Sequence, residues 1–120
     1  MSLGFMNIDS QKEAQVLIAV METLHASGYR LVNVFDSEEW MGRDATAEAT
    51  RDEILEWAMA SDMGAIRYLD THGERFTLHL VFGNSPWEVI ADISGKDHET
   101  IERGNRLIIP ITDKAEAALR

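Results

Sequence analysis

The chain has 120 residues, no cysteine and a formal net charge of −10 at pH 7. The absence of cysteine excludes disulfides, thiolate zinc sites and cysteine nucleophiles. The excess of carboxylates disfavours direct binding to nucleic acids and to anionic membrane surfaces, because both are recognised mainly through Lys and Arg.

A chain of this length predicts one domain over residues 1–120, large enough to bury a core without cross-links. No apolar run approaches the roughly 18 to 20 residues of a membrane span, and no basic segment followed by an apolar stretch marks a secretory signal. We therefore expect a cytoplasmic protein. Residues 1–8 are expected to be flexible or in part a remnant of expression, with Met6 as the native start.

The first predicted element is a helix that starts at a capping box and ends before Gly28. Ser10 and Glu13 have the S-x-x-E spacing of such a box. Gly28 suits the left-handed turn that ends many helices. The residues of the predicted apolar stripe recur at helical spacing: Ala14, Leu17, Ile18, Met21, Leu24 and His25. Residues 29–35 are mostly β-branched or aromatic, which predicts a strand after the turn.

This strand is expected to turn back at once and pair with a short strand over residues 39–43, forming a hairpin. A second helix is predicted over about residues 47–61. Thr50 and Glu53 repeat the capping-box spacing, so a start at Thr50 is an alternative.

Three strands with the clearest alternation in the chain follow, over residues 65–70, 76–82 and 87–93. Their apolar residues alternate with polar ones, which is the pattern of a sheet with one buried and one half-solvated face. Gly73 and Gly83 lie in the turns between the strands. The pattern therefore predicts an antiparallel meander.

The end of the chain is predicted to hold a helical turn at 97–103 closed by Gly104, then a strand at 107–111 and a short terminal helix. Pro110 cannot donate a hydrogen bond to a neighbouring strand, so this last strand is expected at an edge or outside the sheet. The whole order predicts an α+β fold. We expect a single antiparallel sheet, made of the hairpin and the three-stranded meander, with two main helices packed on one face.

Negative charge is concentrated between residues 36 and 62. Nine carboxylates and two arginines lie there, so this segment carries seven of the ten excess negative charges. Three of the carboxylates are spaced i, i+4, i+8 and are expected to form a ridge on the second helix. We define the acidic surface as this ridge, the carboxylates near the hairpin and the tryptophan among them. Its predicted partner-binding residues are Glu38, Glu39, Trp40, Asp44, Glu48, Asp52 and Glu56.

Two interpretations of the acidic surface stay open. In the first, the carboxylates form a solvated face that keeps the protein soluble. In the second, they bind a basic protein, and one form of this is imitation of nucleic acid, since ridge carboxylates about 6 Å apart match the scale of a phosphate ladder. Trp40, Trp57 and Trp87 are likewise either core residues or interface anchors. Trp40 is the best anchor because two glutamates precede it.

No motif of catalysis or cofactor binding is found. The four histidines lack the i, i+4 spacing of a helical zinc motif, and each has an ordinary structural explanation. Glu88 and Asp92 lie about 13 Å apart on one strand, beyond the roughly 5 to 9.5 Å of paired catalytic carboxylates. A pair formed by Asp70 and Asp92 depends on the strand register, which the sequence leaves open. We expect no enzyme, no cofactor and no metal site; a pocket converging on His79, Asp92 or Asp70 would change this.

Several stretches in the middle half of the chain resemble small acidic proteins of unknown function encoded by phages and prophages. They are residues 29–40, 66–70, 80–84 and 88–92, which read YRLVNVFDSEEW, IRYLD, LVFGN and EVIAD. The resemblance implies an α+β fold and a bacterial mobile-element context. It supplies no activity and no site residues.

The sequence supports three hypotheses about function. The first is a non-enzymatic accessory or regulatory protein that binds a basic protein partner through the acidic surface. In a phage context, this partner would be a host protein that binds nucleic acid. The second is a small structural or assembly protein that forms a homodimer through apolar surface. The third and weakest is a small enzyme or ligand binder with a pocket between helix and sheet.

Overall fold

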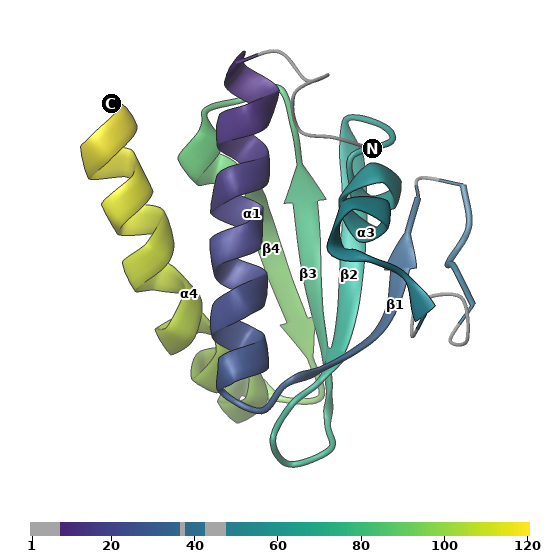
Figure 1. Cartoon of the computed structure of the whole chain (residues 1–120). Coiled ribbons are helices and arrows are strands. Elements are labelled where there is room, and N and C mark those ends of the chain that lie inside the picture. Colours follow the sequence, from purple (N-terminus) through teal and green to yellow (C-terminus); the bar gives the residue numbers. More distant parts are fainter. Residues whose placement is uncertain (1–7, 37, 43–47) are drawn as a thin grey trace.

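The computed structural model describes residues 8–36, 38–42 and 48–120. Its elements, in chain order, are α1 (Ile8–Ala26), β1 (Arg30–Phe35), α3 (Arg51–Ala58), β2 (Met63–Leu69), β3 (Arg75–Val81), the 3₁₀ turn η2 (Pro86–Glu88), β4 (Ile90–Gly95) and α4 (His98–Leu119). The four strands form one antiparallel sheet in the order β1-β2-β3-β4. Figure 1 shows α1 and α3 in front of this sheet, with α4 beside α1. The predicted α+β class and the single antiparallel sheet are confirmed.

The apolar stripe of α1 faces the sheet and forms the centre of the core. Its buried apolar residues are Ala14, Val16, Leu17, Val20, Met21 and Leu24. Val16 and Val20 widen the predicted stripe, because α4 packs along the side of α1. His25, predicted on the stripe, is instead exposed. Gly28 has a φ of 95° and makes the predicted turn after the helix.

The predicted capping box at Ser10 is wrong. α1 already includes Ser10, so this residue lies inside the helix. The side chain of Glu13 is directed elsewhere: the residue is 3% exposed, and its carboxylate accepts a hydrogen bond from Gly83 N–H at 2.9 Å. Glu13 thus joins α1 to the turn after β3, a tertiary contact that local spacing does not reveal. Of the segment predicted to be flexible, residues 1–7 lie outside the described residues.

α3 begins at the alternative start that the sequence offers. Thr50 is the N-cap, and its side chain and that of Glu53 make both bonds of the capping box. Among the described residues, the strand predicted at 39–43 is reduced to a single bridge between Phe35 and Trp40. β1 pairs along its length with β2 instead, so β1 is the fourth strand of the sheet and the predicted hairpin is not formed by two strands.

The predicted meander is confirmed as β2, β3 and β4. β4 starts three residues later than expected, because Pro86 is the first residue of η2 and this turn includes Trp87. Proline suits the first turn of a helix, where its missing N–H is not needed.

The predictions for the C-terminal region are wrong. One helix, α4, replaces the expected helical turn, strand and short helix, and Asp97 caps its start by accepting a hydrogen bond from Thr100 N–H at 2.9 Å. Gly104 does not end a helix; a Cβ at this position would overlap the ring of Phe76. Pro110 lies inside α4 at an exposed position, where it removes one helical hydrogen bond without blocking the contact with the core.

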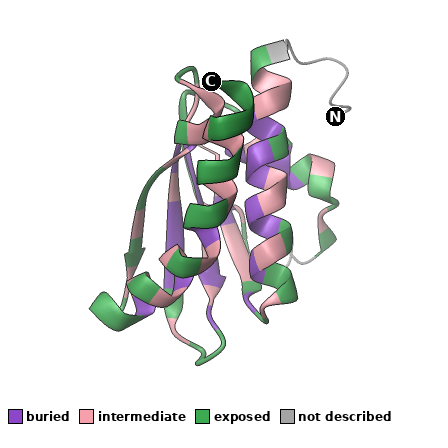
Figure 2. Cartoon of the chain, turned by 90° about the vertical axis from the view of Figure 1, so that its left-hand side faces the viewer, coloured by how far each residue is buried: buried purple, intermediate pink, exposed green. Residues whose placement is uncertain are grey.

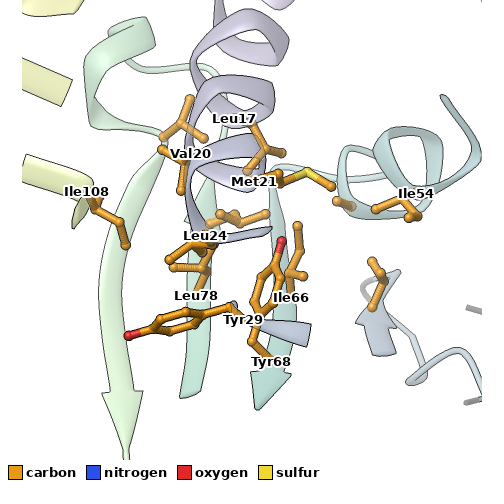
Figure 3. Close-up of a cluster of buried hydrophobic side chains, with 14 of the residues drawn as sticks. Leu17, Val20, Met21, Leu24, Tyr29, Ile54, Ile66, Tyr68, Leu78 and Ile108 are labelled. Atoms are coloured by element: carbon orange, nitrogen blue, oxygen red, sulfur yellow. The ribbon is translucent and has the colours of Figure 1, made fainter. Parts of the chain in front are cut away.

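A single hydrophobic core lies between the sheet and the helices. Figure 3 shows its labelled members from α1, from the sheet, from α3 and from α4: Leu17, Val20, Met21, Leu24, Tyr29, Ile54, Ile66, Tyr68, Leu78 and Ile108. Burial is high along α1 and the central strands and low along α4 (Figure 2). The helices α1, α3 and α4 all pack against this side of the sheet. We call the opposite side, which no helix of the described chain covers, the open face.

The contact of Gly104 with Phe76 predicts the effect of a single methyl group. We expect Gly104→Ala to lower the free energy of unfolding by about 2 kcal/mol, because overpacking of a filled core outweighs the better helix propensity of alanine. Phe76→Leu should make room for the added methyl group. In denaturant titrations the double variant should therefore lose less stability than the two single losses added together. Additive losses, within about 0.5 kcal/mol, would show that these two positions do not compete for space.

Candidate functional site

The acidic surface lies at the β1 edge of the molecule. Its residues follow β1 or belong to α3 and the positions just before it, and both segments lie on the β1 side in Figure 1. Asp44 lies outside the described residues. Four of the predicted carboxylates are exposed: Glu38, Glu39, Glu48 and Glu56. Asp52 is half-buried.

The continuous helical ridge of Glu48, Asp52 and Glu56 is not formed. α3 begins at Arg51, so Glu48 precedes the N-cap and does not share this helix with the other two. Asp52 lies in the first turn, where the helix dipole stabilises a carboxylate. Arg51 forms a 3.7 Å ion pair with Glu22 of α1. The three carboxylates thus do not line up on one helix, which favours the solvated interpretation for this half of the acidic surface.

The other half, Glu38 and Glu39, is held on a tight turn. One carboxylate oxygen of Asp36 accepts hydrogen bonds from Glu38 N–H at 3.0 Å and from Glu39 N–H at 2.9 Å. Asp36 N–H donates to the Glu39 carbonyl at 3.1 Å, and Met41 N–H donates to the Val34 carbonyl at 2.7 Å. The hydrogen bonds from Glu39 and Glu38 hold the pKa of Asp36 below its usual value. The turn therefore keeps its carboxylate acceptor at neutral pH.

Trp40 ends this turn and lies on the open face. Val34 is in the core, so the next residue, Phe35, lies on the opposite side of β1. The ring centres of Phe35 and Trp40 are 5.4 Å apart, and the guanidinium carbon of Arg67 lies 4.0 Å from the centre of the Trp40 ring. Trp57, by contrast, packs against the core from α3. Trp40 is half-buried and lies outside the core, and this position favours its interpretation as an interface anchor.

The strand register defines what else the open face presents. One row across the four strands holds Phe35, Ala65, His79 and Asp92. The next row holds Asn33, Arg67, Thr77 and Ser94, and a third holds Arg30, Leu69 and Arg75. The predicted site residues do not include these cations. Their signal was the alternation itself: Arg67 lies between inward-facing Ile66 and Tyr68 of β2, and Arg75 precedes inward-facing Phe76 of β3.

The residues that would support an enzyme do not converge on one pocket. His79 Nε2 lies 2.8 Å from Ser94 Oγ, and Asp92 is opposite His79 in the register. Asp70 is five residues beyond Ala65, which shares the row of Asp92, so the two carboxylates are about 17 Å apart along the strands. This excludes them as a catalytic pair. A pocket of about 270 Å³ between β4 and α4 has Asp92 on its wall but neither His79 nor Asp70.

Asp70 is a structural residue. Its side chain is 0% exposed, and its carboxylate accepts hydrogen bonds from His72 N–H at 2.8 Å, from Glu74 N–H at 2.9 Å and from Arg103 Nη2 at 3.0 Å. Burial acts to raise the pKa of Asp70, but the hydrogen bonds from Glu74, Arg103 and His72 outweigh it and bring the pKa below its usual value. The ion pair ties the turn between β2 and β3 to α4.

Within the described ranges, no group of three or more His, Asp or Glu side chains is placed to hold a metal ion, and no helix there is long and apolar enough to cross a membrane. No protein-family model, no curated protein and no solved structure matches the chain. The resemblance to phage and prophage proteins stays a prediction, and the function has to be argued from the surfaces.

The hydrogen bonds of Asp70 predict a stability that depends on pH. Because the folded pKa is below that of the unfolded chain, about 3.9, the contribution of Asp70 is complete above that value and is lost as the pH falls through the folded pKa. At pH 7 we expect Asp70→Asn to lower the free energy of unfolding by about 3 kcal/mol, as for a broken buried ion pair. Urea titrations should show this difference shrinking below about pH 4. The exposed Asp113→Asn is the control; an unchanged difference at low pH would contradict the assignment.

Proposed function

We propose that this chain is a non-enzymatic regulatory protein that binds a basic protein partner through Trp40 and the carboxylates beside it. The observation that carries the proposal is the position of Trp40, which a fixed turn holds on the open face next to Glu38 and Glu39. In keeping with the resemblance to phage and prophage proteins, the expected partner is a bacterial host protein that binds nucleic acid. The expected location is the cytoplasm.

The chemistry around Trp40 fits a protein interface. Interface hot spots are enriched in Trp, Tyr and Arg and are surrounded by residues that exclude water. Trp40 has the guanidinium of Arg67 against its ring and Phe35 beside it. A partner that covers this cluster buries an aromatic side chain whose neighbours already hold it in place. Binding then loses little conformational entropy, which favours affinity.

The charge beside Trp40 indicates the chemistry of the partner. Glu38 and Glu39 are exposed, and they belong to the segment that carries most of the excess negative charge. Such a rim attracts Lys and Arg side chains and speeds association, an effect that salt screens. The affinity for the partner is therefore expected to fall steeply between low and moderate salt.

Replacing Trp40 tests the anchor. We expect Trp40→Ala to weaken binding at least about tenfold, because truncating an interface hot spot costs about 2 kcal/mol or more. The midpoint of thermal unfolding should change little, because Trp40 lies outside the core. Glu38→Lys/Glu39→Lys should weaken binding and flatten its salt dependence. Affinity capture from the native host identifies the partner, and calorimetric titration of the purified partner gives the affinities.

The matched control is Glu88→Lys/Asp113→Lys, which makes the same change in net charge at exposed positions outside the acidic surface. This variant should keep the affinity of the unmodified protein to within about twofold, as expected for rim charges away from an interface. Equal losses in both double variants would assign the effect to net charge alone. That result, or normal binding by Trp40→Ala, would refute the proposal.

A groove between α1 and α4 favours a second candidate function, a structural protein that forms a homodimer. The groove measures about 540 Å³, and its apolar lining is Val16, Ala19, Pro110, Ile111, Ala115, Ala118 and Leu119. Lys12 and Lys114 also line it. The α4 of a second copy would bring apolar side chains to this groove together with the exposed carboxylate of Asp113, which complements the two lysines.

Substitutions of two neighbouring alanines of α4 test the homodimer and distinguish it from the first candidate function. Ala118 lines the groove and Ala117 does not, and both are exposed. If the groove is the dimer contact, Ala118→Glu should shift the equilibrium to monomer, because it places a carboxylate in an apolar contact, while Ala117→Glu should leave the dimer intact. Light scattering over a range of concentrations measures this. A mass that stays at 13.5 kDa in the unmodified protein would exclude the homodimer.

A further inference from the structure

The open face gathers cations on a chain whose charge is strongly negative. Four of the eleven Lys and Arg residues belong to it: Arg30, Arg67, Arg75 and Lys96. Two of them border a depression of about 180 Å³ between β3 and β4. The depression is lined by Arg75, Thr77, Ser94, Gly95 and Lys96. It lies toward the opposite edge of the sheet from the acidic surface, and it presents two positive charges and two hydroxyl groups to one small volume.

Within the part of the chain that the structure describes, neither Arg67 nor Arg75 forms a salt bridge. They are diagonal neighbours on β2 and β3, since Arg67 pairs with Thr77 and Arg75 with Leu69. Arg67 Nε is buried without a hydrogen-bond partner. Burial lowers the pKa of Arg67, and the charge of Arg75 lowers it further.

Two described carboxylates lie close to the depression, those of Glu74 and Asp92, and neither is among the residues that line it. Glu74 Oε1 is 3.2 Å from Lys96 Nζ, so it compensates the lysine at the rim. Asp92 shares the row of His79, which lies four residues, or about 13 Å, from Arg75 along β3. Glu74 offsets one of the two cations, so the depression keeps one excess positive charge, which an anion would neutralise.

We propose that this depression binds a phosphate group, either free or carried by a small phosphomonoester. Arg75 supplies a guanidinium fork and Lys96 an ammonium, and Thr77 and Ser94, which pair across β3 and β4, supply hydroxyl donors. Several donors around one small volume suit a phosphate group, which has three strong acceptor oxygens. His79 Nε2 lies 2.8 Å from Ser94 Oγ; with a proton on Nε2, the ring donates to Oγ and leaves the Ser94 hydroxyl free to donate to the anion. The depression shares no lining residue with the proposed partner site, so the two proposals can fail separately.

Titration of the ¹⁵N-labelled protein with inorganic phosphate tests the site. Against sodium chloride of equal ionic strength, we expect saturable amide shifts confined to Thr77, Ser94, Lys96 and their neighbours. Arg75→Gln should weaken binding about tenfold, the loss expected for one charge-assisted donor. Arg106→Gln, an exposed arginine of α4 outside the open face, is the matched control and should bind as the unmodified protein does. Both substituted side chains are exposed, so the variants are expected to fold.

Further arms of the titration identify the source of the phosphate. Tighter binding of glycerol phosphate than of inorganic phosphate assigns a phosphomonoester, and equal binding assigns the free anion. Shifts that do not saturate, shifts located elsewhere or equal binding by Arg75→Gln would overturn the proposal. A short single-stranded oligothymidine that binds far more tightly than glycerol phosphate, with shifts extending to Arg30, would also overturn it in favour of a nucleic-acid surface.

Discussion

The ring of Phe76 occupies the space that a side chain at position 104 would need, and α4 reaches the sheet only because that residue is glycine. One residue earlier, Arg103 forms the ion pair with buried Asp70 at the end of β2. These two contacts set α4 beside α1, on the side of the sheet where α3 also lies. The core then closes on one side, and the open face remains available for ligands. Both the groove between α1 and α4 and the cation cluster follow from this arrangement.

The fold also brings together cations that are scattered along the sequence. Carboxylates concentrate at the β1 edge, around Glu38, Glu39 and α3, whereas Arg67, Arg75 and Lys96 lie across the open face. Trp40 sits at the boundary, with its ring against Arg67. A protein with a net charge of −10 can therefore present a local positive surface. Net charge alone describes long-range attraction, but the ligand of a given site depends on charges within about one Debye length.

Much of the fold follows from local pattern. Alternation identified β2, β3 and β4, helical spacing identified the buried side of α1, and the capping-box spacing of Thr50 and Glu53 located the start of α3. The misassigned residues share a cause. Gly104, Pro110 and Glu13 look like a stop, a strand edge and a cap, but each is explained by packing or exposure in the folded chain. Local spacing cannot distinguish a glycine that ends a helix from one that lets a helix approach an aromatic ring.

For the candidate site too, local sequence pattern predicted some features and the tertiary structure decided the others. By itself the sequence determined the α+β class and the concentration of carboxylates between residues 36 and 62, because composition and period-two alternation are local properties. It also proposed Trp40 as an anchor. Only the tertiary structure decided that Glu48 stands outside α3, that Trp40 lies against Arg67, and that Arg75 and Lys96 border one depression. Those facts depend on which strands pair and in which register, and register is set by contacts between residues far apart in the chain.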